Sequence, residues 1–148
     1  NGEGREVTVA KEMDIVLKCC ELFRLKNNDR LIYEYEENSE IKTIFIPHYT
    51  IIACIKSMLA VIERTGRQFK VQIKVNRSDE TTWIHFVLTG QIDFENVLDR
   101  VDHCGEIQEY EGFNEAVRRW KERFGEDSLK TTLYSRSKGQ LDMSFGCR

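Results

Sequence analysis

Residues 45–66, FIPHYTIIACIKSMLAVIERTG, decide the fold because they combine a helix start, an apolar run and a helix stop. Pro47 fits just before a helix or in its first turn, and Gly66 can take the left-handed backbone that ends one. The residues between them are apolar on nearly all sides, which is typical of a helix buried inside a protein. We therefore predict a buried helix over residues 48–64.

Helical and strand-like patterns alternate on either side of this helix. The predicted elements are a helix at 9–26 capped by Thr8, a strand at 31–35, strands at 69–75 and 83–87 joined by a turn at 76–80, a basic helix at 114–124 capped by Gly125, and strands at 129–134 and 141–145. Residues 91–111 carry many carboxylates, and we interpret them as a long, acidic, partly irregular segment.

This order of elements predicts an α+β two-layer sandwich, with a mixed, mostly antiparallel sheet and three main helices on one face. The chain has 148 residues, a single proline and nine glycines, so we expect one domain over 1–148 without a flexible linker. The formal charge of -3 predicts no general attraction to nucleic acid or to anionic membranes.

The cysteines predict reduced thiols of a cytoplasmic domain. Their number is odd, two are adjacent and no CxxC motif occurs, which suits neither a disulfide framework nor a zinc site. They are Cys19, Cys20, Cys54, Cys104 and Cys147. No apolar run reaches the roughly 18 residues of a membrane span. The start at NGEGRE is interpreted as the start of a fragment, with any membrane anchor of the parent protein upstream.

Several segments, in order, resemble the catalytic domains of the autolysin-sensor class of bacterial sensor histidine kinases, which have the GHKL ATPase fold. LFRLKNNDRLIYEYE at 22–36 is similar to the class motif E-R-R-F-x-D-R-L-x-Y, and FIPHYTIIACIKSML at 45–59 is similar to IPPLLLQPLVENAIKHG. GFNEAVRRWKERFG at 112–125 resembles GLKNVRERLKLLYG, and SKGQLDMSF at 137–145 resembles the closing GKGTTVTLRI hairpin. The resemblance covers nearly the whole chain.

The resemblance implies the setting of the domain. Residues 1–28 would include the entry helix from an upstream dimerisation region, and the parent protein would be a membrane-anchored homodimer that acts on a response regulator. The domain itself would contact neither nucleic acid nor the membrane. The phosphoacceptor histidine of the family lies upstream, so His48, His85 and His103 should not have that role.

In this family a Glu-Asn pair on the buried helix supplies a catalytic carboxylate and a magnesium ligand. The matching positions here are Lys56 and Ser57. One interpretation is that Lys56 contacts phosphate directly in place of magnesium. The other, which we favour, is that Lys56 is a tolerated polar residue at the edge of a closed or abandoned pocket. The sequence therefore assigns no catalytic residue and no metal ligand.

The family's adenine-reading aspartate and its glycine-rich lid also differ here. In FVLTGQID, Leu88 stands at the aspartate position, followed by Thr89 and Gly90. An apolar side chain cannot accept the charge-assisted hydrogen bond from adenine, and Asp93 lies on the wrong side of Gly90 to replace it. The lid reads EIQEYEGFNEA and keeps only Gly112, while its carboxylates oppose a triphosphate.

Lys56, Ser57, Thr89, Gly90 and Gly112 are thus the nucleotide-binding candidates, with ATP and magnesium bound only if the pocket functions. The favoured interpretation is a degenerate domain that binds ATP weakly or not at all and serves two-component signalling as an interaction module. The alternative is an active ATP-dependent protein-histidine kinase domain with an unorthodox pocket.

The remaining candidates have simpler explanations. We interpret His48 as a helix-start residue and His85 as a satisfied strand residue, and a nucleophilic role for Cys104 beside His103 lacks an orienting base. The two tryptophans, Trp83 and Trp120, are predicted to be core residues.

Overall fold

The computed structural model describes residues 5–38, 40–101, 112–135 and 139–148. Their order is strand, helix, two strands, helix, two strands, two helices, a short 3-10 turn and two strands. The elements are β1 (Glu6–Thr8), α1 (Val9–Lys26), β2 (Leu31–Glu37), β3 (Phe45–Pro47), α2 (Thr50–Thr65), β4 (Phe69–Ser78), β5 (Thr81–Gly90), α3 (Phe94–Arg100), α4 (Phe113–Phe124), η1 (Glu126–Ser128), β6 (Leu129–Ser135) and β7 (Gly139–Cys147).

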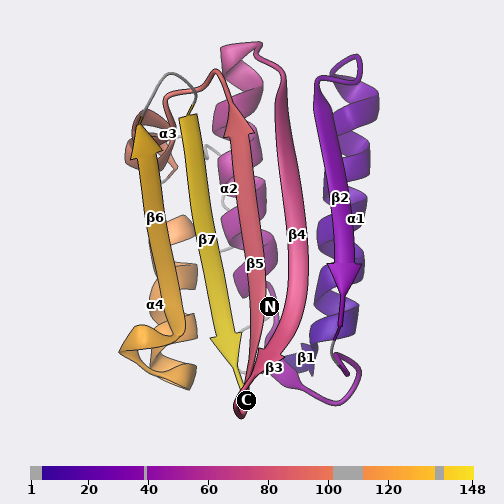
Figure 1. Ribbon diagram of the computed structural model, residues 1–148, viewed down its shortest axis with the longest axis vertical. Coiled ribbons are helices and arrows are strands. Elements are labelled where there is room, and N and C mark those ends of the chain that lie inside the picture. Colours follow the sequence, from indigo (N-terminus) through magenta and orange to yellow (C-terminus); the bar gives the residue numbers. More distant parts are fainter. Residues whose placement is uncertain (1–4, 39, 102–111, 136–138) are drawn as a thin grey trace.

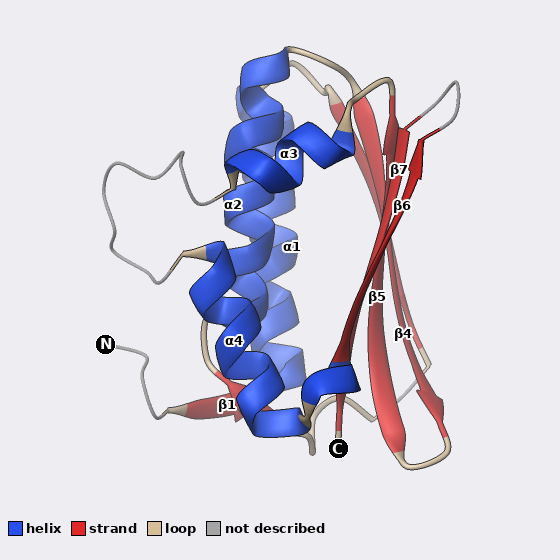
Figure 2. Cartoon of the chain, turned by 90° about the vertical axis from the view of Figure 1, so that its left-hand side faces the viewer, coloured by secondary structure: helices blue, strands red, loops and turns tan. Residues whose placement is uncertain are grey.

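The chain forms the predicted two layers, with the helices on one face of the sheet (Figure 2). The main sheet has the strand order β2-β4-β5-β7-β6, as Figure 1 shows. β2 and β4 are parallel, and the other pairs are antiparallel. The mixed, mostly antiparallel sheet of the prediction is therefore confirmed. A second sheet, small and antiparallel, joins β1 to β3 beside the helices.

The first two long helices form where their caps and apolar spacing predict them. Thr8 caps α1, and its Oγ1 accepts a hydrogen bond from the amide of Lys11 at 3.1 Å. Gly66 ends α2 with φ 69, a left-handed conformation that glycine adopts without strain. α2 packs between α1 and the later helices, which is why it is apolar on several sides.

The neighbouring strands β4 and β5 are longer than the sequence pattern predicts. The polar residues 76–78 continue β4 instead of forming a turn, and Ser78 pairs with Thr81 in the register. Only Asp79 and Glu80 connect the strands, and Asp79 has the left-handed φ of 58 that a tight turn often requires. Polar side chains are tolerated there because one face of the sheet has no helical cover.

The acidic segment contains a helix that we did not predict. α3 buries Phe94 and Val97, whose exposed fractions are 2% and 1%, against the core, while Glu95 and Asp99 are exposed. Asp93 caps this helix, accepting the amide of Asn96 at 3.2 Å. With α3 the described residues contain four α-helices, whereas the sequence predicts three main ones. Residues 102–111, the rest of the predicted irregular segment, lie outside the described residues.

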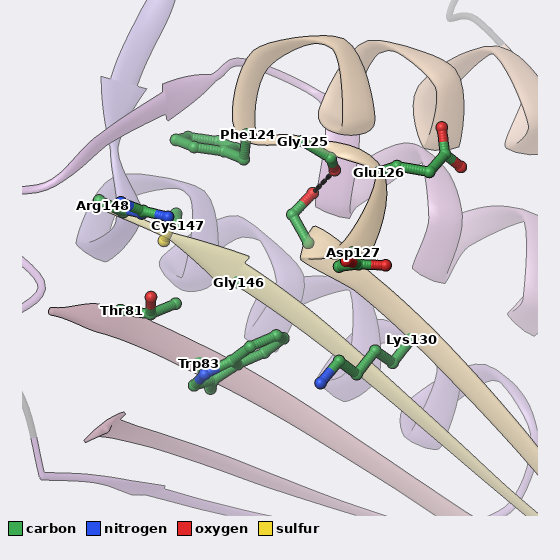
Figure 3. A pocket seen from close by; sticks show the side chains of 11 residues that line it. Thr81, Trp83, Phe124, Gly125, Glu126, Asp127, Lys130, Gly146, Cys147 and Arg148 are labelled. Atoms are coloured by element: carbon green, nitrogen blue, oxygen red, sulfur yellow. Dashed lines mark hydrogen bonds between the residues drawn. The ribbon is translucent and has the colours of Figure 1, made fainter. Parts of the chain in front are cut away.

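The two tryptophans differ from each other. Trp120 on α4 is fully buried, as predicted, and its Nε1 donates to the carbonyl oxygens of Gly146 and Ser128 at 3.1 and 3.3 Å. The core prediction for Trp83 is wrong, because its side chain is half-buried on the uncovered face of the sheet. The indole ring lies against Gly146, with the Lys130 ammonium 4.9 Å from its centroid (Figure 3).

The core lies between the sheet and the helices. Alternate residues of the three central strands face the helices, and they are Phe69, Val71, Ile73, Val75, Ile84, Phe86, Leu88, Leu141, Met143 and Phe145. The intervening residues form the uncovered face. Within the described ranges, no helix combines the length and apolarity needed to cross a bilayer.

Candidate functional site

The helix α2 carries two of the candidate residues on its half-exposed strip. Lys56 and Ser57 lie between the buried residues Ile55 and Met58, and both side chains are half-buried. The ammonium of Lys56 is close enough to Cys19 on α1 to favour that residue's thiolate, although burial is the larger influence and raises the Cys19 pKa.

The end of β5 separates the other candidates by strand alternation. Leu88 faces the helices, pairs with Val71 and Leu141, and is only 2% exposed. Thr89 pairs with Lys70 and Gln140, and therefore faces the uncovered side of the sheet. At the position that the resemblance matches to the adenine-reading aspartate, the structure thus has a core leucine with no polar atom in its side chain.

Gly90 has a packing role that is independent of any ligand. It pairs with Phe69 and Gly139, and an added Cβ would lie 3.0 Å from both the Gln68 carbonyl oxygen and the Phe69 Cβ. A Cβ on Gly139 would overlap the carbonyl oxygen of Ile92, where the chain leaves β5. The close backbone approach thus requires glycine at position 139 and leaves little room for a side chain at position 90.

Thr89 and Gly90 line an open groove of about 650 Å³ at the end of the sheet. Its other walls come from the turn between α2 and β4, from Ile32 and from Gln91. Neither Lys56 nor Ser57 lines this groove. The structure therefore does not bring the two pairs of candidates together around this groove.

Gly112 begins α4, as its N-cap with φ -76, and no side chain caps the helix there. The segment 102–111, which precedes α4, lies outside the described residues. It contains the predicted lid carboxylates Glu106, Glu109 and Glu111, together with His103 and Cys104. The carboxylate of Asp93 caps α3 at the exposed surface.

At the position that the resemblance matches to the catalytic carboxylate, the chain has Lys56, a cation, whereas magnesium is held by carboxylate, amide and phosphate oxygens. In the described ranges, no three His, Cys, Asp or Glu side chains gather as a metal cluster would require.

Sequence reasoning missed a buried polar cluster at the start of α2. Glu12 on α1 is fully buried, and its Oε1 lies 3.0 Å from Nδ1 of His48. Its carboxylate also accepts the amides of Tyr49 and Ile52, each at 3.2 Å. His48 lies in the turn just before α2, which begins at Thr50 and not at residue 48 as predicted, and its partner lies 36 residues away on α1. The one sequence signal for this cluster is Glu12 itself, a charged residue among the apolar residues on the buried side of α1.

A second cluster joins α1 to β2 at the surface. Glu21 accepts hydrogen bonds from Arg24 at 2.6 and 3.1 Å and from the Tyr33 hydroxyl at 2.7 Å. The bonds from Arg24, and then that from Tyr33, lower the pKa of Glu21 to about 2. This cluster fixes α1 on the edge strand and does not approach the candidate nucleotide residues.

The cysteines and His85 fit structural roles. Cys19, Cys20 and Cys147 are free thiols, and burial raises the pKa of Cys20 and of Cys147 to about 12. High thiol pKa values make poor nucleophiles at neutral pH. His85 is satisfied on the uncovered face, with Nδ1 2.7 Å from the Ser144 hydroxyl, and burial lowers its pKa.

The pocket in Figure 3, of about 350 Å³, lies at the opposite end of β5 from the candidates. Trp83, Phe124 and Lys130 are among its walls. It therefore offers no connection to the nucleotide positions.

Comparison with known proteins places the fold. No protein-family model matches the sequence, and no curated protein matches it at a significant level. Among solved structures, two nucleotide-free crystal forms of the catalytic domain of histidine kinase ThkA (TM1359) are similar. They have TM-scores of 0.56 and 0.57 and identities of 13% and 11%, and the matches cover 95% and 97% of this chain and 93% and 97% of theirs. The Acinetobacter baumannii histidine kinase AdeS has a TM-score of 0.54 at 12% identity, covering 97% of this chain and 67% of that one. The chain thus has the α+β fold of histidine kinase catalytic domains.

Proposed function

We propose that this chain is a histidine-kinase-type ATPase-fold domain that binds ATP weakly or not at all and works in two-component signalling as an interaction module. The fold supports the first part of the proposal, since its similarity to ThkA and AdeS extends over nearly the whole chain. The sequence resemblance to the autolysin-sensor class supports the setting, with a helical dimerisation region upstream and a response regulator as partner.

The burial of Leu88 is the observation that carries the loss of ATP binding. An adenine amino group brought to this position would find a hydrocarbon side chain that is 2% exposed and packed into the core. A buried donor left without an acceptor costs about 1–3 kcal/mol, or roughly a tenfold to hundredfold loss of affinity. The half-exposed pair Lys56 and Ser57 adds to this loss, because it supplies no carboxylate for a metal-bound triphosphate.

The test is calorimetric titration of the 148-residue domain with ATP, with and without magnesium. The intrinsic fluorescence of Trp83 and Trp120 gives an independent signal, and circular dichroism confirms that the protein is folded. We expect no saturable binding below about 1 mM, which corresponds to about -4 kcal/mol. A magnesium-dependent Kd in the micromolar range would overturn the proposal and favour an active kinase domain with an unorthodox pocket.

A further inference from the structure

We propose that the buried cluster around Glu12 is a conformational coupling device that links the entering strand β1 and helix α1 to both α2 and α4. We call the residues Glu12, His48, Tyr49 and Arg119 the N-terminal junction. The coupling needs no nucleotide, so its test is separate from that of the proposed function.

The first observation is that α1 caps α2 from outside. α2 has no side-chain cap of its own, and the carboxylate of Glu12 takes that place by accepting the amides of Tyr49 and Ile52 at 3.2 Å each. A carboxylate at a helix N-terminus also interacts favourably with the helix dipole. Because Glu12 is fully buried, these contacts have no water to replace them if α1 moves.

The second observation is backbone strain at the same point. Tyr49 has φ 72, a left-handed conformation that non-glycine residues adopt only when their surroundings impose it. The surroundings here are the Glu12 carboxylate on its amide and the ring of His48, whose centroid lies 4.0 Å from that of Tyr49. Withdrawal of Glu12 would let Tyr49 relax to negative φ, and the first turn of α2 would change with it.

The third observation is that the junction continues to β1 and to α4. The His48 amide donates to the carbonyl of Arg5 at 3.0 Å, and the His48 carbonyl accepts from Arg119 Nη2 on α4 at 2.8 Å. Arg123, one turn further along α4, pairs with Glu6 of β1 at 2.8 Å. One residue, His48, therefore contacts the entering chain, α1 and α4 together.

Space for movement exists beside these contacts. A cavity of about 250 Å³ lies between the entering chain and α4, with Arg5, Pro47 and Arg119 among its walls. Figure 2 shows β1 beside the lower end of α4. A displacement of β1 or α1 would therefore change the position of α4, because the polar contacts between them are either made or broken. α4 in turn contacts the sheet through the hydrogen bond from Trp120 to Gly146 of β7.

The experiment measures amide hydrogen exchange along the whole 148-residue chain, without nucleotide, in two variants approached from opposite ends. Glu12→Gln removes the charge from α1, and Arg119→Met removes the guanidinium from α4. Asp14→Asn is the matched control on α1, since Asp14 makes an exposed pair with Lys18. Arg118→Met is the control on α4, because Arg118 pairs with glutamates at the surface.

Coupling is reciprocal, so Glu12→Gln on α1 should loosen α4, and Arg119→Met on α4 should loosen the start of α2, which Glu12 caps. We expect Glu12→Gln to accelerate amide exchange about tenfold or more at the start of α2 and also in α4. Arg119→Met should accelerate exchange to the same extent at residues 49–53. Exchange in β4 and β5 should be unchanged in both variants. The controls should show neither effect. Acceleration confined to the mutated contact, or uniform acceleration across the sheet, would overturn the proposal. If Glu12→Gln fails to fold, the effect of Arg119→Met on residues 49–53 decides alone.

Discussion

Restoring a carboxylate at the adenine position should damage the fold without creating a nucleotide site. In Leu88→Asp, the lost apolar side chain leaves a cavity among well-packed neighbours, which costs about 2–5 kcal/mol for comparable truncations of buried leucines. Leu88 is 2% exposed, so the upper part of that range applies. The total stability of a domain is only about 5–15 kcal/mol, and the variant should therefore be strongly destabilised.

The charge adds a pH-dependent part that a neutral variant can isolate. A buried aspartate without a cation has a folded pKa raised above the unfolded value of about 3.9, because burial disfavours the charged form. Between the two pKa values the native state binds more protons, so the stability of Leu88→Asp falls as pH rises. At pH values above the folded pKa, the variant loses about 1.4 kcal/mol of stability for each unit by which folding raises the pKa of the aspartate at position 88. This loss vanishes below about pH 4.

The assay is urea unfolding of Leu88→Asp and Leu88→Asn at about pH 7 and about pH 4, followed by tryptophan fluorescence. We expect Leu88→Asp to be the less stable variant at neutral pH and the two to converge in acid. Equal stabilities at both pH values, within about 1 kcal/mol of the unmodified protein, would show that position 88 faces a hydrated pocket. A melting temperature of Leu88→Asp that rises with magnesium and ATP would refute the account of the site directly.

Three further predictions concern other parts of the domain. The double variant Lys56→Glu, Ser57→Asn introduces the Glu-Asn pair of the resembled kinases at two half-exposed positions, so the free energy of unfolding should change by less than about 1 kcal/mol. Calorimetry should still show a Kd for magnesium-ATP no tighter than about 1 mM. Gly139→Ala should lower the melting temperature markedly, because its methyl group overlaps the Ile92 carbonyl. Glu21→Gln should remove stability at neutral pH and lose its effect as pH falls from about 4 toward about 2, since the folded pKa of Glu21 is about 2; chemical unfolding across this range measures it.

The long helices could be predicted because their signals are local. A cap, a helical apolar period and a terminal glycine define α1 and α2 to within about two residues. α3 is not predicted, although Phe94, Val97 and Val101 have helical spacing. The many carboxylates around them favour the interpretation of a solvated, irregular segment. Charge on the exposed side of a short helix does not exclude an apolar buried side.

The candidate site was only partly predictable for a related reason. Alternation along Ile84, Phe86 and Leu88 places position 88 on the helix-facing side, and it thereby separates Leu88 from Thr89. The same alternation puts Trp83 on the uncovered face, but Trp83 is large and apolar, so composition favours the wrong side. The pairing of Glu12 with His48 could not be predicted, because it depends on the packing of two helices distant in sequence.

Gly90 matches a glycine of the resembled kinases, but this match says little about whether a nucleotide binds. Gly90 lies in a tight site, where an added Cβ would be 3.0 Å from Gln68 and Phe69, whether or not a nucleotide binds nearby. Its presence therefore does not favour an intact pocket over a degenerate one. Under the proposed function Leu88 does discriminate, because an aspartate at this position would need a polar, hydrated site where this chain has core packing. The proposal therefore rests on Leu88 and not on the glycines, since the close contacts that assemble the sheet would be kept whether or not the position matched to the adenine-reading aspartate holds hydrocarbon.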